Sequence, residues 1–489
     1  MERHESVAAV QRRGCETLWQ LSSGSEYKNA IGEAGGVSAI LHAMRQYSLV
    51  ADVQRVGCGS LANIAGQDDN KKRIVAGEGI ALIVAAMQQH HSNCTVQQEA
   101  CRLLGGLASG SDTYKKLVAA ADGISVVVRA MERHQGQAGV QAYGCFALGE
   151  LTLRMVNNAK LAADAGAIPL IVCAMEQHEL VPNVQTSGCL ALLRLASTQD
   201  DKIKKCIVEA KGVAVVVGAM QQHGLVAPVQ QHACMVLAYL AKDNVENQEA
   251  IAHSDRIFSL IVAAMQRHES HANVQTNACS ALGKLTFRMV DKAKLAADAG
   301  AIPLIVCAME RHELVAEVQG SGCFAFWCLA GTKDDNIKKD IVEAKGVAVV
   351  VGAMQKHGLV AEVQTYACWA LGSLAQKNAE NQEAIAGSDG IFSLIVAAME
   401  RHESDAKVQI CACCVLYVLC LWWKKDKSIA RKVRESVTRA RRNFPEECDV
   451  KALAIGIHIW LFWLHYCVCI ALLYGGYSAL MVVILTKKI

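Results

Sequence analysis

The chain has 489 residues, of which 52% are hydrophobic and only 5% aromatic, and it contains just 5 prolines. The net charge of +3 is unevenly placed: residues 424–489 hold 12 Lys/Arg and 5 Asp/Glu (+7), whereas residues 1–423 hold 37 and 41 (−4). A long, mildly acidic body lacks the basic surface that nucleic-acid binding requires, so we expect no nucleic-acid partner.

The cysteines indicate a reducing compartment. There are 21 of them, an odd number, and the first ten residues (MERHESVAAV) are polar and charged rather than a secretory signal. Unpaired thiols without a secretion signal are typical of a cytoplasmic protein. We therefore expect reduced cysteines and a cytoplasmic location.

An internal repeat organises the chain from its first residue to about residue 420. The dipeptide Val-Gln recurs ten times at spacings of 43 to 45 residues, beginning at Val10, Val53, Val96, Val140, Val184, Val229, Val274, Val318, Val363 and Val408. A cysteine follows each of these valines by five residues, and a methionine precedes each by nine. Residues 151–279 also recur at 285–413 with an offset of 134, which is three repeats and indicates duplication of a block.

One unit predicts three helices in chain order. Residues 157–164 (NNAKLAAD) form a short first helix that ends at Ala165-Gly166. Residues 167–178 (AIPLIVCAMEQH) form a second, with Pro169 in its first turn, where a missing N–H costs little. Residues 184–196 (VQTSGCLALLRLA) form a third, with apolar residues at helical spacing. Because one unit cannot bury its apolar faces alone, stacked units must share a continuous core.

The recurring motifs V-Q-x-x-[GA]-C-x-x-L-x-x-L and A-G-x-I-x-x-[IV]-V-x-A-M-x-x-H resemble the armadillo repeat. They are most similar to the armadillo region of leucine-rich-repeat kinases and of related protist armadillo proteins. The resemblance implies an all-α fold, a right-handed armadillo-type superhelical solenoid of about nine to ten three-helix repeats, followed here by a C-terminal hydrophobic helix.

The repeat boundaries give the expected domain organisation. Residues 1–21 form a partial N-terminal repeat that begins inside a second helix and supplies a third helix. The armadillo repeats then fill 22–420 as units 22–65, 66–108, 109–152, 153–196, 197–241, 242–286, 287–330, 331–375 and 376–420. Residues 421–451 are expected to be a basic juxtamembrane linker, and 452–485 a transmembrane or tail-anchor segment.

Three side chains recur along the repeats without forming a chemical site. Equivalent helices in adjacent repeats lie about 8–10 Å apart, too far for a shared disulfide or zinc ion. We therefore interpret the cysteines and methionines as core residues. A histidine follows each methionine by three residues, except at Tyr47; we interpret it as meeting carbonyls at a helix C-terminus rather than sensing pH.

No sequence motif indicates catalysis. The chain contains no Walker-type glycine loop, no G-x-S-x-G and no H-E-x-x-H. We therefore expect no enzyme activity, no catalytic residue, no cofactor, no metal and no small-molecule substrate.

The armadillo resemblance places candidate binding residues on the third helices, which line a concave groove in that family. In the import-receptor branch these helices carry a Trp and, four residues on, an Asn; only Trp369 and Asn63 match here, in different repeats. The groove positions vary along the chain while the core positions are nearly constant, as expected either for an irregular partner or for neutral drift. The candidates for binding a protein or extended peptide are Phe146, Glu150, Arg194, Met235, Tyr239, Lys284, Phe324 and Trp369.

The composition changes sharply after Trp423. Residues 424–442 hold 9 basic and 2 acidic residues, and the 34 residues from Ala452 to Leu485 contain no Asp, Glu, Lys or Arg. A bilayer-spanning helix needs about 20 apolar residues, and a preceding basic run places the solenoid on the cytosolic side. The alternatives are an error in the gene model or a hydrophobic helix packed on the last repeat.

These features favour a non-catalytic protein–protein interaction scaffold, tethered to a membrane by its C-terminus. Two alternatives stay open: a soluble regulatory region of a larger multidomain enzyme such as a repeat kinase, and a transport adaptor for peptide cargo. The missing Trp/Asn pattern disfavours the second.

Overall fold

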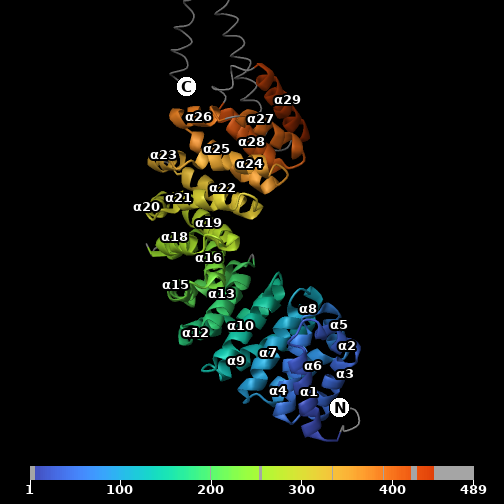
Figure 1. Ribbon diagram of the computed structural model, residues 1–489. Coiled ribbons are helices and arrows are strands. Elements are labelled where there is room, and N and C mark those ends of the chain that lie inside the picture. Colours follow the sequence, from blue (N-terminus) through green and yellow to red (C-terminus); the bar gives the residue numbers. More distant parts are fainter. Residues whose placement is uncertain are drawn as a thin grey trace, which may run out of the picture. The chain divides into compact units, whose positions relative to one another are not determined.

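The computed structural model describes residues 6–198, 200–252, 256–332, 334–388, 390–419 and 427–444. Throughout these ranges the regular structure is α-helical, in 29 helices. The chain divides into two compact units, residues 1–267 and 268–489, and each is built from three-helix repeats (Figure 1). The expected all-α, armadillo-type solenoid is confirmed.

The third helices of successive repeats stack side by side in each unit. In the first unit they are α1 (Ala8–Leu21), α4 (Ala51–Ile64), α7 (Cys94–Ala108), α10 (Ala138–Thr152), α13 (Pro182–Ala196) and α16 (Ala227–Ala241). In the second unit they are α19 (Ala272–Thr286), α22 (Ala316–Ala330), α25 (Ala361–Ala375) and α28 (Ala406–Val418).

Within each unit, a second helix packs on the third helix of its own repeat, and a first helix packs on the third helix of the repeat before it. The first helices are α2 (Tyr27–Glu33), α5 (Asp68–Ala76), α8 (Asp112–Ala120), α11 (Val156–Asp164), α14 (Asp201–Glu209), α17 (Val245–Ala252), α20 (Val290–Asp298), α23 (Asp335–Glu343) and α26 (Ala379–Ala386). The second helices are α3 (Gly36–Gln46), α6 (Gly79–Gln89), α9 (Gly123–Arg133), α12 (Ala167–Gln177), α15 (Gly212–Gln222), α18 (Arg256–Arg267), α21 (Ala301–Arg311), α24 (Gly346–Lys356) and α27 (Ile391–Arg401).

The turn between first and second helices depends on a left-handed backbone. Gly166 and Gly300 have φ values of 83° and 88°, which glycine adopts at little cost. The helices of this repeat begin and end within two residues of their predicted bounds. The largest difference is that α13 starts at Pro182, because proline fits the first turn of a helix and Val181 supplies the extended N-cap.

The recurring cysteines and methionines form the core, as expected. Each cysteine of the third-helix motif is at most 1% exposed, and each described methionine of the second-helix motif at most 2%. The small residue before the cysteine makes room for that methionine. A Cβ atom added at Gly188 would lie 2.6 Å from the sulfur of Met175, so the methionine side chain occupies the space that this glycine leaves.

The glutamine of each Val-Gln dipeptide completes the end of the preceding second helix. The Nε2 atom of Gln185 donates to the carbonyls of Met175 and His178, both at 2.9 Å. The same pair of bonds recurs from Gln54, Gln97, Gln141, Gln230, Gln319, Gln364 and Gln409. These side chains satisfy carbonyls that a helix C-terminus leaves without an intrahelical partner.

The histidines join one repeat to the next. Nε2 of His178 lies 2.7 Å from the carbonyl oxygen of Gln135, in the turn of the preceding repeat. Equivalent bonds of 2.6–2.9 Å are made by His90, His134, His223, His312, His357 and His402. The ring meets a carbonyl, as interpreted from the sequence, but in the neighbouring repeat rather than at the end of its own helix.

The basic segment after the last repeat contains a helix, α29 (Lys427–Asn443), which packs on α27 and α28. Its residues Val433, Val437 and Ala440 are at most 2% exposed. The helix thereby covers part of the last repeat and turns a polar face outward, as the terminal unit of a solenoid must.

The candidate anchor at 452–485 lies outside the described residues. Among the helices that are described, none is alone long and apolar enough to cross a membrane. One bent pair, α11 with α12, passes the same test of length and composition. Ile168, Ile171 and Val172 of α12 are at most 5% exposed, which is the burial of a repeat core.

Candidate functional site

In the first unit, the third-helix face begins with a polar and aromatic network around Arg102 of α7. Its guanidinium donates to Oδ1 of Asn63 at 2.7 Å and to Oε2 of Glu99 at 2.9 Å. It also lies over the ring of Trp19, 5.9 Å from the centroid. Asn63 is the one residue that matches the asparagine of the import-receptor pattern. The Asn63 amide also donates to the carbonyl of Trp19 at 3.4 Å, so both ends of its side chain have partners within the repeats.

Phe146 and Glu150 follow on α10, and the structure limits how much of them a partner could contact. Phe146 packs over Gly105 of the preceding third helix, where an added Cβ atom would meet the ring at 2.6 Å. Glu150 is only 8% exposed. Phe146 therefore offers one ring edge, whereas Glu150 mainly contributes charge from below the surface.

Arg194, Met235 and Tyr239 form the last part of this face in the first unit, on α13 and α16. All three side chains are half-buried. The Nε atom of Arg194 is buried without a hydrogen-bond partner. Burial lowers the pKa of the neighbouring His232, the Thr186 carbonyl raises it, and the positive charge of Arg194 lowers it.

In the second unit, α19, α22 and α25 carry a cluster of aromatic rings. Trp327 stacks on Trp369 with ring centroids 5.4 Å apart and an angle of 17° between the planes. Tyr366 lies 5.1 Å from Phe324 and 6.1 Å from Trp327. Phe287, just after α19, meets the edge of Trp327 at 5.5 Å. Trp327, Tyr366 and Trp369 are half-buried, so each keeps part of its ring on the surface.

Lys284 and Phe324 support this aromatic cluster. The Nζ atom of Lys284 lies 4.6 Å from the centroid of the Phe324 ring, a cation–π contact. Phe324 itself is only 6% exposed and packs over Gly283, where an added Cβ atom would lie 2.4 Å from the phenylalanine ring. The structure thus brings Lys284, Phe324 and Trp369 together, with Phe324 as the buried base.

Sequence reasoning missed three members of the cluster, Phe287, Trp327 and Tyr366. It followed only the positions one and five residues after each cysteine. Tyr366 is three residues before Trp369 and therefore shares its helix face. Trp327 lies four residues after Cys323, a position that holds glycine or alanine in six of the ten repeats. An aromatic residue at a position that is usually small was the available signal.

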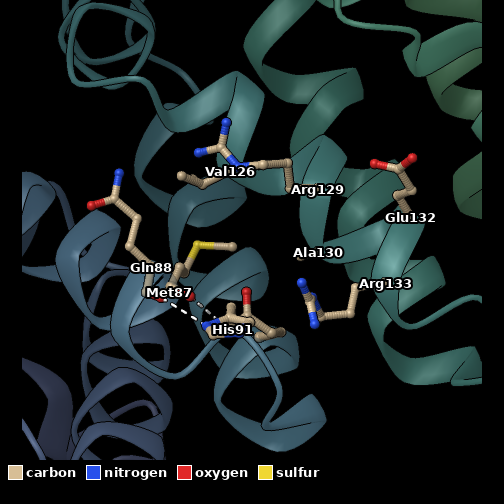
Figure 2. A pocket seen from close by; sticks show the side chains of 9 residues that line it. Met87, Gln88, His91, Val126, Arg129, Ala130, Glu132 and Arg133 are labelled. Carbon is tan, nitrogen blue, oxygen red and sulfur yellow. Dashed lines mark hydrogen bonds between the residues drawn. The ribbon is translucent and has the colours of Figure 1, made fainter.

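A recess between two repeats of the first unit lies away from the predicted candidates. Figure 2 shows Met87 and His91 facing Arg129 and Arg133 of α9 across it. Arg129 is paired with Asp122 at 3.0 Å. Nothing in this recess resembles a nucleophile with an activating base. Over the described part of the chain, no three His, Cys, Asp or Glu side chains are grouped to hold a metal ion.

The buried cysteines have little nucleophilic character. Burial raises the pKa of Cys101, Cys145, Cys189 and Cys234 to about 12. At neutral pH these thiols are protonated, and the thiolate is the form that attacks electrophiles or binds metals.

The repeats match the family described as LRRK2 ARM repeat over residues 1–167, 161–296 and 289–459. The chain belongs to the LRRK2 ARM repeat family. The armadillo resemblance of the sequence motifs is therefore confirmed across nearly the whole chain. A search of curated proteins found no significant match.

Two solved structures share the armadillo fold. An engineered protein determined by a structural genomics consortium is 27% identical, with a TM-score of 0.68 over 85% of this chain and 96% of that one. A structure from work on a phosphorylation switch that controls the interaction between cadherin and β-catenin is 16% identical, with a TM-score of 0.64 over 93% and 94%. The second likeness shows the fold alone.

Proposed function

We propose that this armadillo chain is a non-catalytic scaffold that binds a protein or an extended peptide along its third helices. The observation that carries the proposal is the partly exposed cluster of Trp327, Tyr366 and Trp369 in a chain that is only 5% aromatic. Tryptophan and tyrosine dominate the binding energy of many protein interfaces, because their rings bury a large area at a small entropic cost.

The two units present different chemistry to a partner. In the second unit, the outward side chains around Trp327 and Trp369 include Ser321, Thr365 and Ser373, which carry no charge. In the first unit, the positively charged side chain of Arg194 is half-buried and favours an acidic group. We therefore expect apolar or aromatic anchors where the partner meets the second unit, and a carboxylate where it meets Arg194.

A photo-crosslinker on the third helices tests the proposal. Benzoylphenylalanine replaces Trp369 in one variant and Tyr239 in another, in cells that express the full chain. Leu161 of α11 is the control position, because its side chain is 51% exposed but lies on a first helix. We expect both third-helix positions to give an adduct of the same partner and Leu161 to give none.

Substitution of the same residues provides the second arm. Tyr239→Ala with Trp369→Ala should weaken capture of the crosslinked partner at least tenfold, while the melting temperature stays within about 4 °C. Tyr27→Ala is the matched control, an aromatic residue on α2 that is 50% exposed. Unchanged capture by the double variant, or equal loss with Tyr27→Ala, would rule out the third-helix face.

We also propose that the C-terminus tethers the scaffold to a membrane, with the repeats facing the cytosol. The support is the uncharged run from Ala452 to Leu485 after a basic segment. Carbonate extraction of membranes tests this in cells that express the full chain or residues 1–444. Truncation at 444 keeps α29 on the last repeat. We expect only the full chain in the membrane pellet, and full chain in the supernatant would exclude a spanning anchor.

The second candidate function is a regulatory repeat region of a larger enzyme, favoured by the match to LRRK2 ARM repeat. Immunoblotting of native extracts with an antibody against residues 1–444 distinguishes the two. A band near the 52.6 kDa of this chain supports the scaffold. A much larger band that carries kinase peptides in mass spectrometry supports the alternative.

A further inference from the structure

Helix α29 separates apolar and basic side chains onto opposite faces. Val433, Ser436, Val437 and Ala440 recur at helical spacing and are buried against the last repeat. The exposed cations of the helix are Arg431, Lys432, Arg434, Arg439, Arg441 and Arg442. Packing on α27 and α28 holds this basic face in one orientation.

Few acidic groups neutralise this face. Within the helix, Glu435 lies 3.8 Å from Arg431, and both side chains are well exposed, so the pair is weak. Glu400 of α27 and Glu403, in the turn after it, border the recess that Arg439 lines. Arg434, Arg441 and Arg442 point into solvent on the remaining surface. The contrast with the rest of the protein is large, since residues 1–423 carry a net charge of −4.

The exposed side chains suit an anionic surface better than a nucleic acid. Single-stranded nucleic acids are bound through aromatic platforms, and duplex bases are read by amide and guanidinium groups inserted in a groove. The exposed positions described in α29 hold no aromatic residue, and the other polar residues there are Ser428, Glu435, Thr438 and Asn443. A flat array of cations is the pattern that anionic lipid headgroups attract.

The sequence after α29 points to the same partner. Ala452 follows Arg442 by ten residues and begins the 34 residues without Asp, Glu, Lys or Arg. A basic helix that close to a segment of membrane-spanning length would lie beside the headgroups. We propose that the exposed face of α29 docks on an anionic lipid surface and so fixes how the last repeat is presented to the membrane.

The proposal extends the proposed tether but is tested without it. In the full-length variant Leu464→Lys/Ile470→Lys, two charges in the apolar run disfavour insertion. This variant is sedimented with vesicles of pure phosphatidylcholine, or with 30% phosphatidylserine. We expect at least tenfold tighter binding to the anionic vesicles at about 0.1 M salt and loss of that difference at about 0.5 M, because salt screens surface charge.

Charge-matched variants identify the surface. Arg431→Gln/Arg434→Gln/Arg441→Gln/Arg442→Gln, made in the same background, should lose the preference for anionic vesicles at least tenfold. The control Lys72→Gln/Lys202→Gln/Lys205→Gln/Lys339→Gln removes the same charge from exposed first-helix positions and should bind as before. Equal loss in both variants, no loss in the first, or binding to a 20-nucleotide RNA in place of the vesicles would overturn the proposal. The tether is judged separately, by carbonate extraction.

Discussion

Two polar side chains that recur along the repeats, a glutamine and a histidine, have structural roles, although their regular spacing could suggest a binding or catalytic site. The glutamine after the recurring valine satisfies the end of its own second helix, and the histidine donates to the turn of the preceding repeat. Both act on carbonyls that helix ends leave without intrahelical partners. A regular row of polar residues in a solenoid therefore indicates repeated caps before it indicates a binding site.

The glutamine caps can be tested one at a time. Gln185→Leu leaves the carbonyl of Met175 buried without a donor and removes one of the two donors to the carbonyl of His178, so we expect a loss of about 1–3 kcal/mol in the free energy of unfolding. Urea unfolding followed by circular dichroism measures it. Gln177→Ala, at an exposed position of the same repeat, is the control and should change stability by less than about 0.5 kcal/mol. Equal effects of the two substitutions would contradict the capping role.

The cysteines offer a second test at this scale. Cys206 is exposed on α14, whereas burial raises the pKa of Cys189 to about 12. Because the thiolate is the reactive form, iodoacetamide at pH 8 should modify Cys206 at least about a hundredfold faster than Cys189. Peptide mapping by mass spectrometry measures both rates. The difference should vanish in 8 M urea, and rapid modification of native Cys189 would mean that the core is open.

At the scale of single helices, periodicity predicts the helices of the repeats, whereas packing decides whether a segment such as α29 docks on them. The three helices of one repeat follow from apolar spacing, a proline near a helix start and a glycine between helices. Helix α29 was not foreseen, because its many charges suggested a linker. The four buried positions from Val433 to Ala440 have helical spacing, yet whether a short amphipathic segment docks depends on an apolar surface elsewhere in the chain.

The contribution of α29 to stability can be measured by truncation. Removing it exposes the surface of the last repeat that Val433 and Val437 cover, which we expect to cost about 3 kcal/mol at most, since area estimates are upper bounds. The chain 1–423 should therefore melt several degrees below the chain 1–444 and bind more of the dye ANS. In the 1–444 background, Val433→Asp/Val437→Asp should have the same effect and Arg431→Gln/Arg434→Gln should not. Identical melting of the two truncations would show that α29 does not stabilise the last repeat.

Across the whole molecule, the sequence predicted the fold better than it predicted which candidate binding residues lie together on the surface. The repeat count and core positions follow from spacing, but Trp327 and Tyr366 join Trp369 only because three third helices stack side by side. Conversely, Glu150 and Phe324 are covered by neighbours that no single repeat reveals. A position that varies between repeats lies on the surface of a single repeat. The neighbouring repeat then determines how much of that surface remains exposed.

Because each repeat packs mainly on its neighbours, the effect of a destabilising substitution should stay local. Within each unit the stabilising contacts join adjacent repeats, so a cavity should loosen the repeat that contains it and those beside it. Met399→Ala in α27 removes a fully buried side chain, at a cost of about 2–5 kcal/mol. Amide hydrogen exchange should quicken in α27, α28 and α29 and stay unchanged in α3, α4 and α5. Met44→Ala in α3 is the reciprocal control and should give the opposite pattern. If either substitution quickened exchange equally in both sets of helices, the repeats would be unfolding as one cooperative body, and stability could not be assigned to individual neighbours.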